Sequence, residues 1–289
     1  MLIGSQLLGF SRGGCVLDTL SSGVPAGAFG LRRLTASYNG KCINVRRSSD
    51  NSAIDIGFVG NSLDVVTLLN FVGSGSGYIT TWYNQGSLGS AGNMTQYSAA
   101  FDPRIVLNGT LATLNGRPAL DFSENTTSFL NKPQALSPAG MTGAAFNFVG
   151  TFQPNGAGVI IPYQVGATTG AGSLFINFSP NSGSPTVTVV NYGVVGTPTT
   201  GVSTGTPTIW TAAGDTSLRL YVNGTLGASS SSAITYNAAT SAARIGQNFG
   251  SSYWQGLMSE LVQTITTLAD SDRHIIEHNQ EAYYGISGI

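Results

Sequence analysis

The stretch SLRLYVNGTL, residues 217–226, decides the fold class of this chain. An alternating strand leads directly into Asn223-Gly224, a dipeptide that favours the two-residue turns of β-hairpins. Two strand-like segments follow, ARIGQN at 243–248 and YWQGLMSELVQTI at 253–265. The chain then closes with LADSDRHIIEHNQEAYYGI, which predicts a helix that Asp270 or Ser271 caps and Gly285 ends. These segments predict antiparallel strands followed by a C-terminal helix.

The composition extends this prediction to the whole chain. Its 289 residues are 41% hydrophobic and include 39 Gly and 11 Pro, which is typical of short strands joined by turns. An all-β sandwich of this length accommodates one large core or two modest ones. Residues 133–214 contain no Asp, Glu, Lys or Arg, yet they include alternating segments such as AAFNFVGTF at 144–152. Because such a stretch aggregates when exposed, we expect it to be buried in a sandwich or an oligomer.

Charge, cysteine usage and motifs argue against several classes of function. A formal net charge of −1 without a Lys/Arg run predicts no nucleic-acid or anionic-membrane partner, and no apolar run has the length of a membrane span. The first residues lack a basic region and a long apolar region, so we expect no secretory signal. Cys15 and Cys42 fit no metal or redox spacing, and GSGSGY lacks the lysine of a phosphate loop. His274 and His278 lack a third placed ligand, so neither a metal nor a cofactor is expected.

An unusual concentration of charge lies between residues 32 and 64. The segment CINVRRSSDNSAIDIGFVGNSLD alone holds two arginines and three aspartates, in a chain with only 9% charged residues. The cluster is either a ligand site or a structural clamp. We favour a clamp in which Arg46 and Arg47 pair with Asp50 and Asp55 beneath the sheet.

Two parts of the chain resemble known families. The order LYVNG, RIG and YWQGLMSELVQTITTLADSDRHIIEHNQEAYYG resembles the C-terminal half of laminin-G-like and concanavalin A-like jelly-roll domains, over about residues 140–289. Upstream, VRRSSDN at 45–51, Asp55-Ile56-Gly57 and Thr81-Trp82-Tyr83 resemble the catalytic domain of α-L-arabinofuranosidase B, and similar segments occur in tailed-phage virion proteins. The resemblance implies a mostly β, concanavalin A-like antiparallel sandwich with short helices and a C-terminal helix. It divides the chain into an N-terminal arm, residues 1–30, and a jelly-roll domain, residues 31–289.

The resemblance also raises the question of catalysis. A retaining glycosidase needs two carboxyl groups about 5 Å apart. In the arabinofuranosidase family these lie in the sandwich beside a disulfide between adjacent cysteines, and this chain has no adjacent cysteines. Asn84 stands in TTWYNQGS where the family shows an acid. We therefore expect no catalytic residue and keep a glycoside hydrolase as an alternative, with four weak candidates: Asp121, Glu124, Asp215 and Glu260.

The leading hypothesis is a virion surface protein, a spike, fibre or decoration component with a lectin-like jelly roll. It implies other virion proteins as partners, a homo-oligomer, contact with a bacterial surface polysaccharide and an extracellular location after host lysis. A purely structural decoration protein is a further alternative. Sugar-binding sites use aromatic faces and amide side chains. The segment GQNFGSSYWQ supplies both, and the predicted ligand-binding residues are Gln247, Asn248, Tyr253 and Trp254, of which the two aromatic residues also fit a core strand.

Overall fold

The computed structural model describes residues 15–123, 127–132, 143–153, 163–165, 174–179, 186–191, 199–231, 243–247 and 253–288. Within these residues the antiparallel strands form one continuous 19-stranded sheet, folded into two layers, the back sheet and the front sheet, and two 2-stranded sheets. The same residues form two α-helices and two short 3₁₀ helices, η1 (Val16–Thr19) and η2 (Gly89–Gly92). Neither α-helix of this described part is long and apolar enough to cross a membrane.

The back sheet is built around the last strand of the chain. In spatial order it contains β1 (Gly27–Gly30), β23 (Leu257–Thr264), β14 (Ala144–Thr151), β19 (Pro207–Gly214), β20 (Leu218–Val222) and β21 (Thr225–Ser230). β20 and β21 form the hairpin that the sequence predicts. Asn223 and Gly224 at its turn have φ values of 46° and 73°, the left-handed backbone that a two-residue hairpin turn requires.

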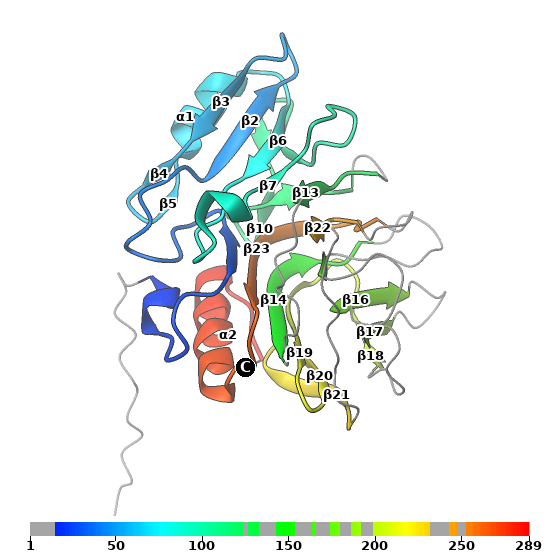
Figure 1. The fold of residues 1–289 in the computed structure, drawn as a ribbon. Helices are drawn as coiled ribbons and strands as arrows, with labels where there is room; N and C mark the ends of the chain where they lie inside the picture. Colours follow the sequence, from blue (N-terminus) through cyan, green and yellow to red (C-terminus); the bar gives the residue numbers. More distant parts are fainter. Residues whose placement is uncertain are drawn as a thin grey trace, which may run out of the picture.

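The front sheet faces the back sheet across the core (Figure 1). Its order is β3 (Ala53–Ile56), β2 (Ile43–Arg47), β6 (Gly77–Trp82), β7 (Met94–Thr95), β13 (Leu130–Lys132), β22 (Ala243–Ile245), β15 (Tyr163–Val165), β16 (Leu174–Ser179), β17 (Thr186–Asn191) and β18 (Thr199–Gly201). The helix α1 (Val65–Val72) lies beside β2 and β3, and Asp64 caps it by accepting a hydrogen bond from the Thr67 amide.

Two short strands join the sheets along one edge. β8 (Arg104–Leu107) pairs with β6 of the front sheet and with β12 (Leu120–Asp121), which in turn pairs with β23 of the back sheet. Three short strand pairs complete the described structure: β8 with β9 (Thr110–Leu111), β10 (Thr113–Leu114) with β11 (Arg117–Pro118), and β4 (Phe58–Val59) with β5 (Ser62–Leu63). The observed fold is the expected mostly β sandwich with a C-terminal helix.

The core between the sheets is rich in aromatic rings. Phe148 and Trp210 stack with ring centroids 4.9 Å apart, and Phe178 and Trp254 meet edge to face at 5.0 Å. All four side chains are fully buried. Aromatic pairs at such separations add about 0.5–1.5 kcal/mol each beyond the burial of their area. Much of the stability of the sandwich is therefore concentrated between β14, β19 and the segment that leads into β23.

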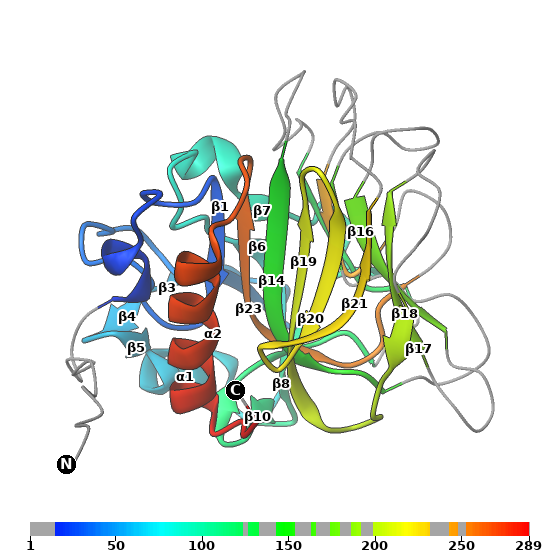
Figure 2. The same ribbon diagram turned by 90° about the horizontal axis from the view of Figure 1, so that it is seen from below.

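The helix α2 (Asp270–Tyr284) covers the outer face of the back sheet, where it lies along β1, β23 and β14 (Figure 2). Gly285 ends it with a left-handed φ of 62°, as predicted. The predicted cap is wrong, because Ala269 occupies the cap position and Asp270 instead pairs with Arg273 inside the first turn. Asp272 accepts hydrogen bonds from the backbone amides of the Ser21–Ser22 segment, which ties the helix to the start of the described chain.

Part of the segment predicted as an N-terminal arm belongs to the sandwich. β1 pairs with β23 from Gly27 to Gly30, and Leu17 and Leu20 of the preceding segment are buried against the back-sheet side of the molecule. Residues 1–14 lie outside the described residues. The expected boundary at residue 30 therefore falls inside a folded region.

Candidate functional site

The outer face of the front sheet carries a row of polar side chains. Successive residues of a strand point to opposite faces of its sheet, so the buried Val45, Trp82 and Leu130 leave their neighbours pointing outward. Register places these neighbours side by side across β2, β6, β7, β13 and β22. The row consists of half-buried residues: Asn44, Thr81, Thr95, Asn131 and Arg244.

Three half-exposed aromatic rings gather at the β13–β22 end of this row. The centroids of Phe101 and Phe129 lie 5.5 Å apart, and those of Phe129 and Tyr253 lie 6.4 Å apart. The guanidinium of Arg244 lies 5.2 Å from the centre of the Phe129 ring, within the range of a cation–π contact. A continuous surface of ring faces and one cation results.

Amide side chains hold the cation in place. Arg244 donates from Nε to Asn131 Oδ1 at 3.0 Å and from a terminal nitrogen to Gln247 Oε1 at 2.9 Å. A β-bridge pairs Gln247 with Tyr253 and so brings these two residues together at this surface. Burial lowers the pKa of Arg244, although an arginine stays charged at neutral pH. We call this group the aromatic site: Phe101, Phe129, Asn131, Arg244, Gln247 and Tyr253.

Two of the four predicted ligand residues belong to the aromatic site, namely Gln247 and Tyr253. Trp254 does not, because it is fully buried among the core rings and points to the other side of its strand. Asn248 lies outside the described residues. Four members of the site were missed, since Phe101, Phe129, Asn131 and Arg244 come together only through the pairing of β13 with β22.

The charged cluster of residues 32–64 pairs differently from the prediction. Arg47 does bind Asp50, donating from Nε at 2.9 Å and from a terminal nitrogen at 2.6 Å. Arg46, however, pairs with Asp102 at 2.9 Å, and Asp55 accepts hydrogen bonds from Asn44 and from the Tyr83 hydroxyl. The expected Arg46–Asp55 pairing is therefore wrong, because Asp102 approaches the end of β2 from the loop before β8.

Asp102 is a buried carboxyl group whose pKa is raised. Its side chain is almost fully buried, and burial raises its pKa to about 6 despite the Arg46 partner. Its Oδ2 accepts from Arg46, whereas its Oδ1 has no hydrogen-bond partner among the described residues. Arg46 also donates to the Asn51 side chain and the Ala99 carbonyl, so it joins the β2–β3 turn to the segment between β7 and β8.

The side chains of Asn84 and Gln85, in the TTWYNQGS motif, form hydrogen bonds with backbone groups in and around β1. Asn84 Oδ1 accepts from the Ala28 amide at 2.7 Å, and its Nδ2 donates to the Ala26 carbonyl at 3.1 Å and the Gly89 carbonyl at 3.2 Å. Gln85 likewise satisfies backbone groups on the segment after β1. Asn84 is therefore a structural residue whose amide donates as well as accepts, a role that an aspartate would not fill.

The structure does not bring the candidate catalytic carboxylates together. Asp121 pairs with Arg104 at 2.6 Å on the joining edge, and Asp215 pairs with Arg219 at 2.8 Å in the turn between β19 and β20. Glu260 is fully buried beneath α2. Glu124 lies outside the described residues.

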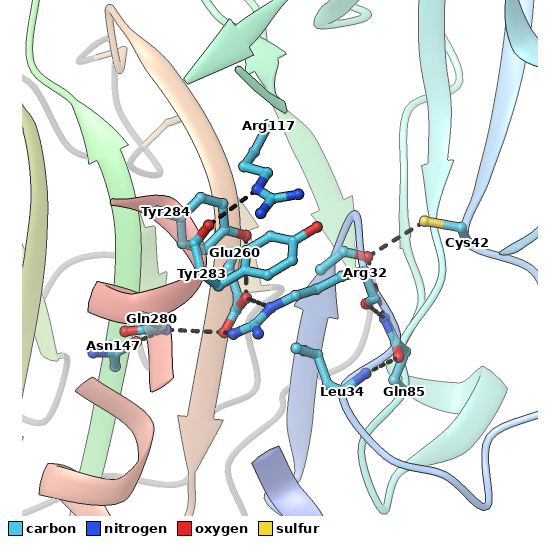
Figure 3. A network of polar contacts seen from close by, with 11 residues as sticks. Arg32, Leu34, Cys42, Gln85, Arg117, Asn147, Glu260, Gln280, Tyr283 and Tyr284 are labelled. Atoms are coloured by element: carbon cyan, nitrogen blue, oxygen red, sulfur yellow. Dashed lines mark hydrogen bonds and ion pairs between the residues drawn. The ribbon is translucent and has the colours of Figure 1, made fainter. Parts of the chain in front are cut away.

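Glu260 is the centre of a buried network under the helix (Figure 3). Arg32 donates to it from Nε at 2.7 Å, Gln280 donates at 3.0 Å, and the Tyr284 hydroxyl donates at 3.1 Å. The ring of Tyr283 lies between Arg32 and Arg117, each 4.3 Å from its centre. Because every group around Glu260 is a structural partner, this acid serves to attach α2 to the sheet.

A second buried group lies further along the same helix. Glu277 accepts from the Thr211 hydroxyl at 2.6 Å and from Arg273 at 2.5 Å, and burial raises its pKa. His278 lies 3.4 Å from Glu281, and His274 contacts Arg273. The described residues contain no group of three or more His, Cys, Asp or Glu side chains suited to a metal ion.

Comparison with known proteins gives a fold relationship. Neither a protein-family model nor a curated protein sequence matches this chain. Among solved structures, an arabinofuranosidase complexed with arabinofuranosyl-α-1,2-xylobiose superposes with a TM-score of 0.66 and 18% identity, over 88% of this chain and 62% of that one. A GH54 α-L-arabinofuranosidase soaked with a cyclic sulfate inhibitor gives 0.65 and 18%, with the same coverage. The chain thus shares the β-sandwich fold of these enzymes and spans about 62% of their length.

Proposed function

We propose that this protein binds carbohydrate and that a sugar ring rests on the aromatic site. The observation that carries the proposal is the half-exposed surface of Phe129 and Tyr253 beside the Asn131 amide. A sugar presents a C–H face that packs on aromatic rings, and its hydroxyls exchange hydrogen bonds with amide and phenol groups. The Nδ2 of Asn131 and the hydroxyl of Tyr253 make no hydrogen bond within the described part of the chain, so both are available to a ligand.

The wider setting is part of the same proposal. The protein is a lectin-like component of a virion surface, held among other virion proteins as a homo-oligomer, and its ligand is a host surface polysaccharide. The resemblance of VRRSSDN at 45–51 and Thr81-Trp82-Tyr83 to segments of phage virion proteins supports this setting, as does the uncharged segment 133–214, which favours burial in an assembly. The test is to purify virus particles and look for this protein in them. Its presence supports the virion location, and its absence refutes it.

The binding proposal is tested with purified protein on an array of bacterial and plant glycans, followed by calorimetric titration of the best ligand. Replacing Tyr253 with Ala removes a ring worth about 0.5–1.5 kcal/mol of contact together with its hydroxyl, so we expect the Kd to rise roughly tenfold. The matched control is Tyr97→Ala, because Tyr97 is 82% exposed and lies outside the aromatic site. Equal binding by both variants would contradict the assignment of the site.

A glycoside hydrolase is the second candidate, and the shared sandwich fold is the observation that favours it. Each described carboxylate already accepts a hydrogen bond or ion pair from a neighbouring residue, as Asp121, Asp215 and Glu260 illustrate. Released reducing sugar, assayed in the same array wells, separates the two functions. Release that survives Asp121→Asn and Glu260→Gln would exclude these two carboxylates and leave Asp215 and Glu124 of the four candidates.

A further inference from the structure

An open surface pocket lies on the edge that joins the two sheets. It has a volume of about 420 Å³, which falls in the range of small-ligand pockets, roughly 300–1,000 Å³. β8, β9 and β12 surround it. Its lining combines one ion pair with aliphatic and small polar side chains: Arg104, Leu107, Asn108, Thr110, Leu111, Ala112 and Asp121.

The ion pair gives this edge pocket its chemistry. Arg104 donates to Asp121 Oδ2 at 2.6 Å, and Asp121 Oδ1 accepts from the Ser123 amide at 2.8 Å. Each carboxylate oxygen has two lone pairs, so Asp121 retains the capacity to accept from a ligand hydroxyl. Leu107 and Leu111 supply apolar surface beside the charges. The Asp121 carboxylate can accept from the hydroxyls of a vicinal diol, and Leu107 and Leu111 can pack against the C–H groups that carry those hydroxyls.

The edge pocket is close to the aromatic site along the chain. Phe101 precedes Arg104 by three residues, which limits the separation of their Cα atoms to about 10 Å. Tyr253 precedes Leu257 by four residues, and Leu257 is the register partner of Asp121. The cross-strand pairing of Tyr78 with Arg104 and of Arg104 with Asp121 continues the outer face of the front sheet into the pocket.

We propose that the edge pocket is a second sugar subsite, which binds a vicinal diol on another residue of the same glycan chain. This inference rests on the proposed carbohydrate binding and adds that the natural ligand is an oligosaccharide of several residues. The aromatic site holds one residue by stacking, and Asp121 accepts hydrogen bonds from a residue further along the chain. Affinity therefore depends on glycan length, with a gain at the length that reaches both sites.

The first test is a length series. Arabino-, xylo- and malto-oligosaccharides from monosaccharide to hexasaccharide are titrated against the wild-type protein and against Thr110→Trp, which fills the edge pocket. Thr113→Trp is the matched control, because Thr113 is equally an exposed strand threonine and lies outside the lining. Thr110→Trp blocks the charge-assisted hydrogen bonds to Asp121, so it should weaken long oligosaccharides at least roughly tenfold and leave monosaccharide binding at the aromatic site unchanged. Equal loss at all lengths, or no loss, overturns the second subsite.

The second test separates failure of the subsite from failure of the proposed function. In Tyr253→Ala protein, free arabinose, galactose and mannose are titrated while the NMR signal of the Arg104 Nε–H group is followed. A shift that Thr110→Trp removes supports the edge pocket even when the aromatic site binds nothing. An unmoved signal overturns the pocket, whereas loss of array binding in Tyr253→Ala alone still supports the aromatic site.

Discussion

Replacing Asn84 with Asp changes one side-chain atom and should destabilise the sandwich severely. The Asn84 side chain is almost fully buried, and its Nδ2 donates to the carbonyls of Ala26 and Gly89. A carboxylate has no hydrogen to donate, so both carbonyls would face a negatively charged oxygen instead. The two bonds that Oδ1 accepts, from the amides of Ala28 and Gly86, would remain.

The magnitude follows from the two lost bonds. A buried polar group left without its partner costs about 1–3 kcal/mol, so two carbonyls give about 2–6 kcal/mol at neutral pH. Protonation would restore one donor, which means that the new carboxyl group has a raised pKa in the folded state. A raised acid pKa costs stability as pH increases, because the unfolded chain ionises first. The loss should therefore be smaller at pH 4 than at pH 7.

The assay is urea unfolding followed by tryptophan fluorescence, since Trp82, Trp210 and Trp254 are all fully buried. Asn93→Asp is the matched control: Asn93 is half-buried, and its Oδ1 only accepts from the Asn84 amide, which a carboxylate does equally well. We expect that variant to stay within about 0.5 kcal/mol of wild type. Similar unfolding midpoints for the two variants would refute the reasoning.

Three further outcomes are expected. Arg32→Met leaves Glu260 buried without its cation, so the free energy of unfolding in urea should fall by about 3–5 kcal/mol. The Arg32→Met, Glu260→Met double variant should recover part of this stability. Losses that simply add in the double variant would argue against the pairing. Asp102, with its pKa raised from 3.8 to about 6, favours folding at low pH and loses that contribution as pH rises through 6. Wild type should therefore gain about 2 kcal/mol relative to Asp102→Asn between pH 7 and pH 4.5, and parallel pH profiles would exclude this role. Gly256→Ala places a Cβ 1.8 Å from the Thr151 carbonyl at a φ of 148°, so a loss of at least about 2 kcal/mol is expected in thermal unfolding, and an unchanged Tm would contradict it.

Features governed by neighbouring residues were predictable from the sequence. The Asn223-Gly224 turn specifies its own hairpin, and Arg47 meets Asp50 only three residues away. The left-handed Gly285 ends α2 for the same local reason. The mostly β class follows from such signals repeated along the chain, and the alternation of buried and outward residues follows from strand geometry.

Features governed by distant pairing were not predictable. Arg46 meets Asp102 across 56 residues, and its nearer acids offered a plausible but incorrect partner. The buried face of α2 contains Glu277 and Gln280, residues that a hydrophobic pattern assigns to solvent. Their burial is compensated by hydrogen bonds to the back sheet. Glu277 accepts from Thr211, and Gln280 donates to Asn147 and to Glu260.

The candidate site follows the same division. Gln247 and Tyr253 could be proposed because they lie in one segment with aromatic and amide side chains. Phe129 and Asn131 precede them by more than a hundred residues, and only the β13–β22 register joins the two groups. Trp254 directly follows Tyr253 and is buried in the core, a difference that the aromatic and amide composition of the segment does not predict.

The position of β23 has a consequence for biosynthesis. This strand pairs with β1, β12 and β14, so it lies inside the back sheet although it comes after all the other described strands in the sequence. A ribosome releases residues 257–284 only after every other strand has emerged, and until then three strands have open edges and the uncharged segment has no completed core. Folding of this unit must therefore follow its synthesis, and the non-local pairing makes that folding slow.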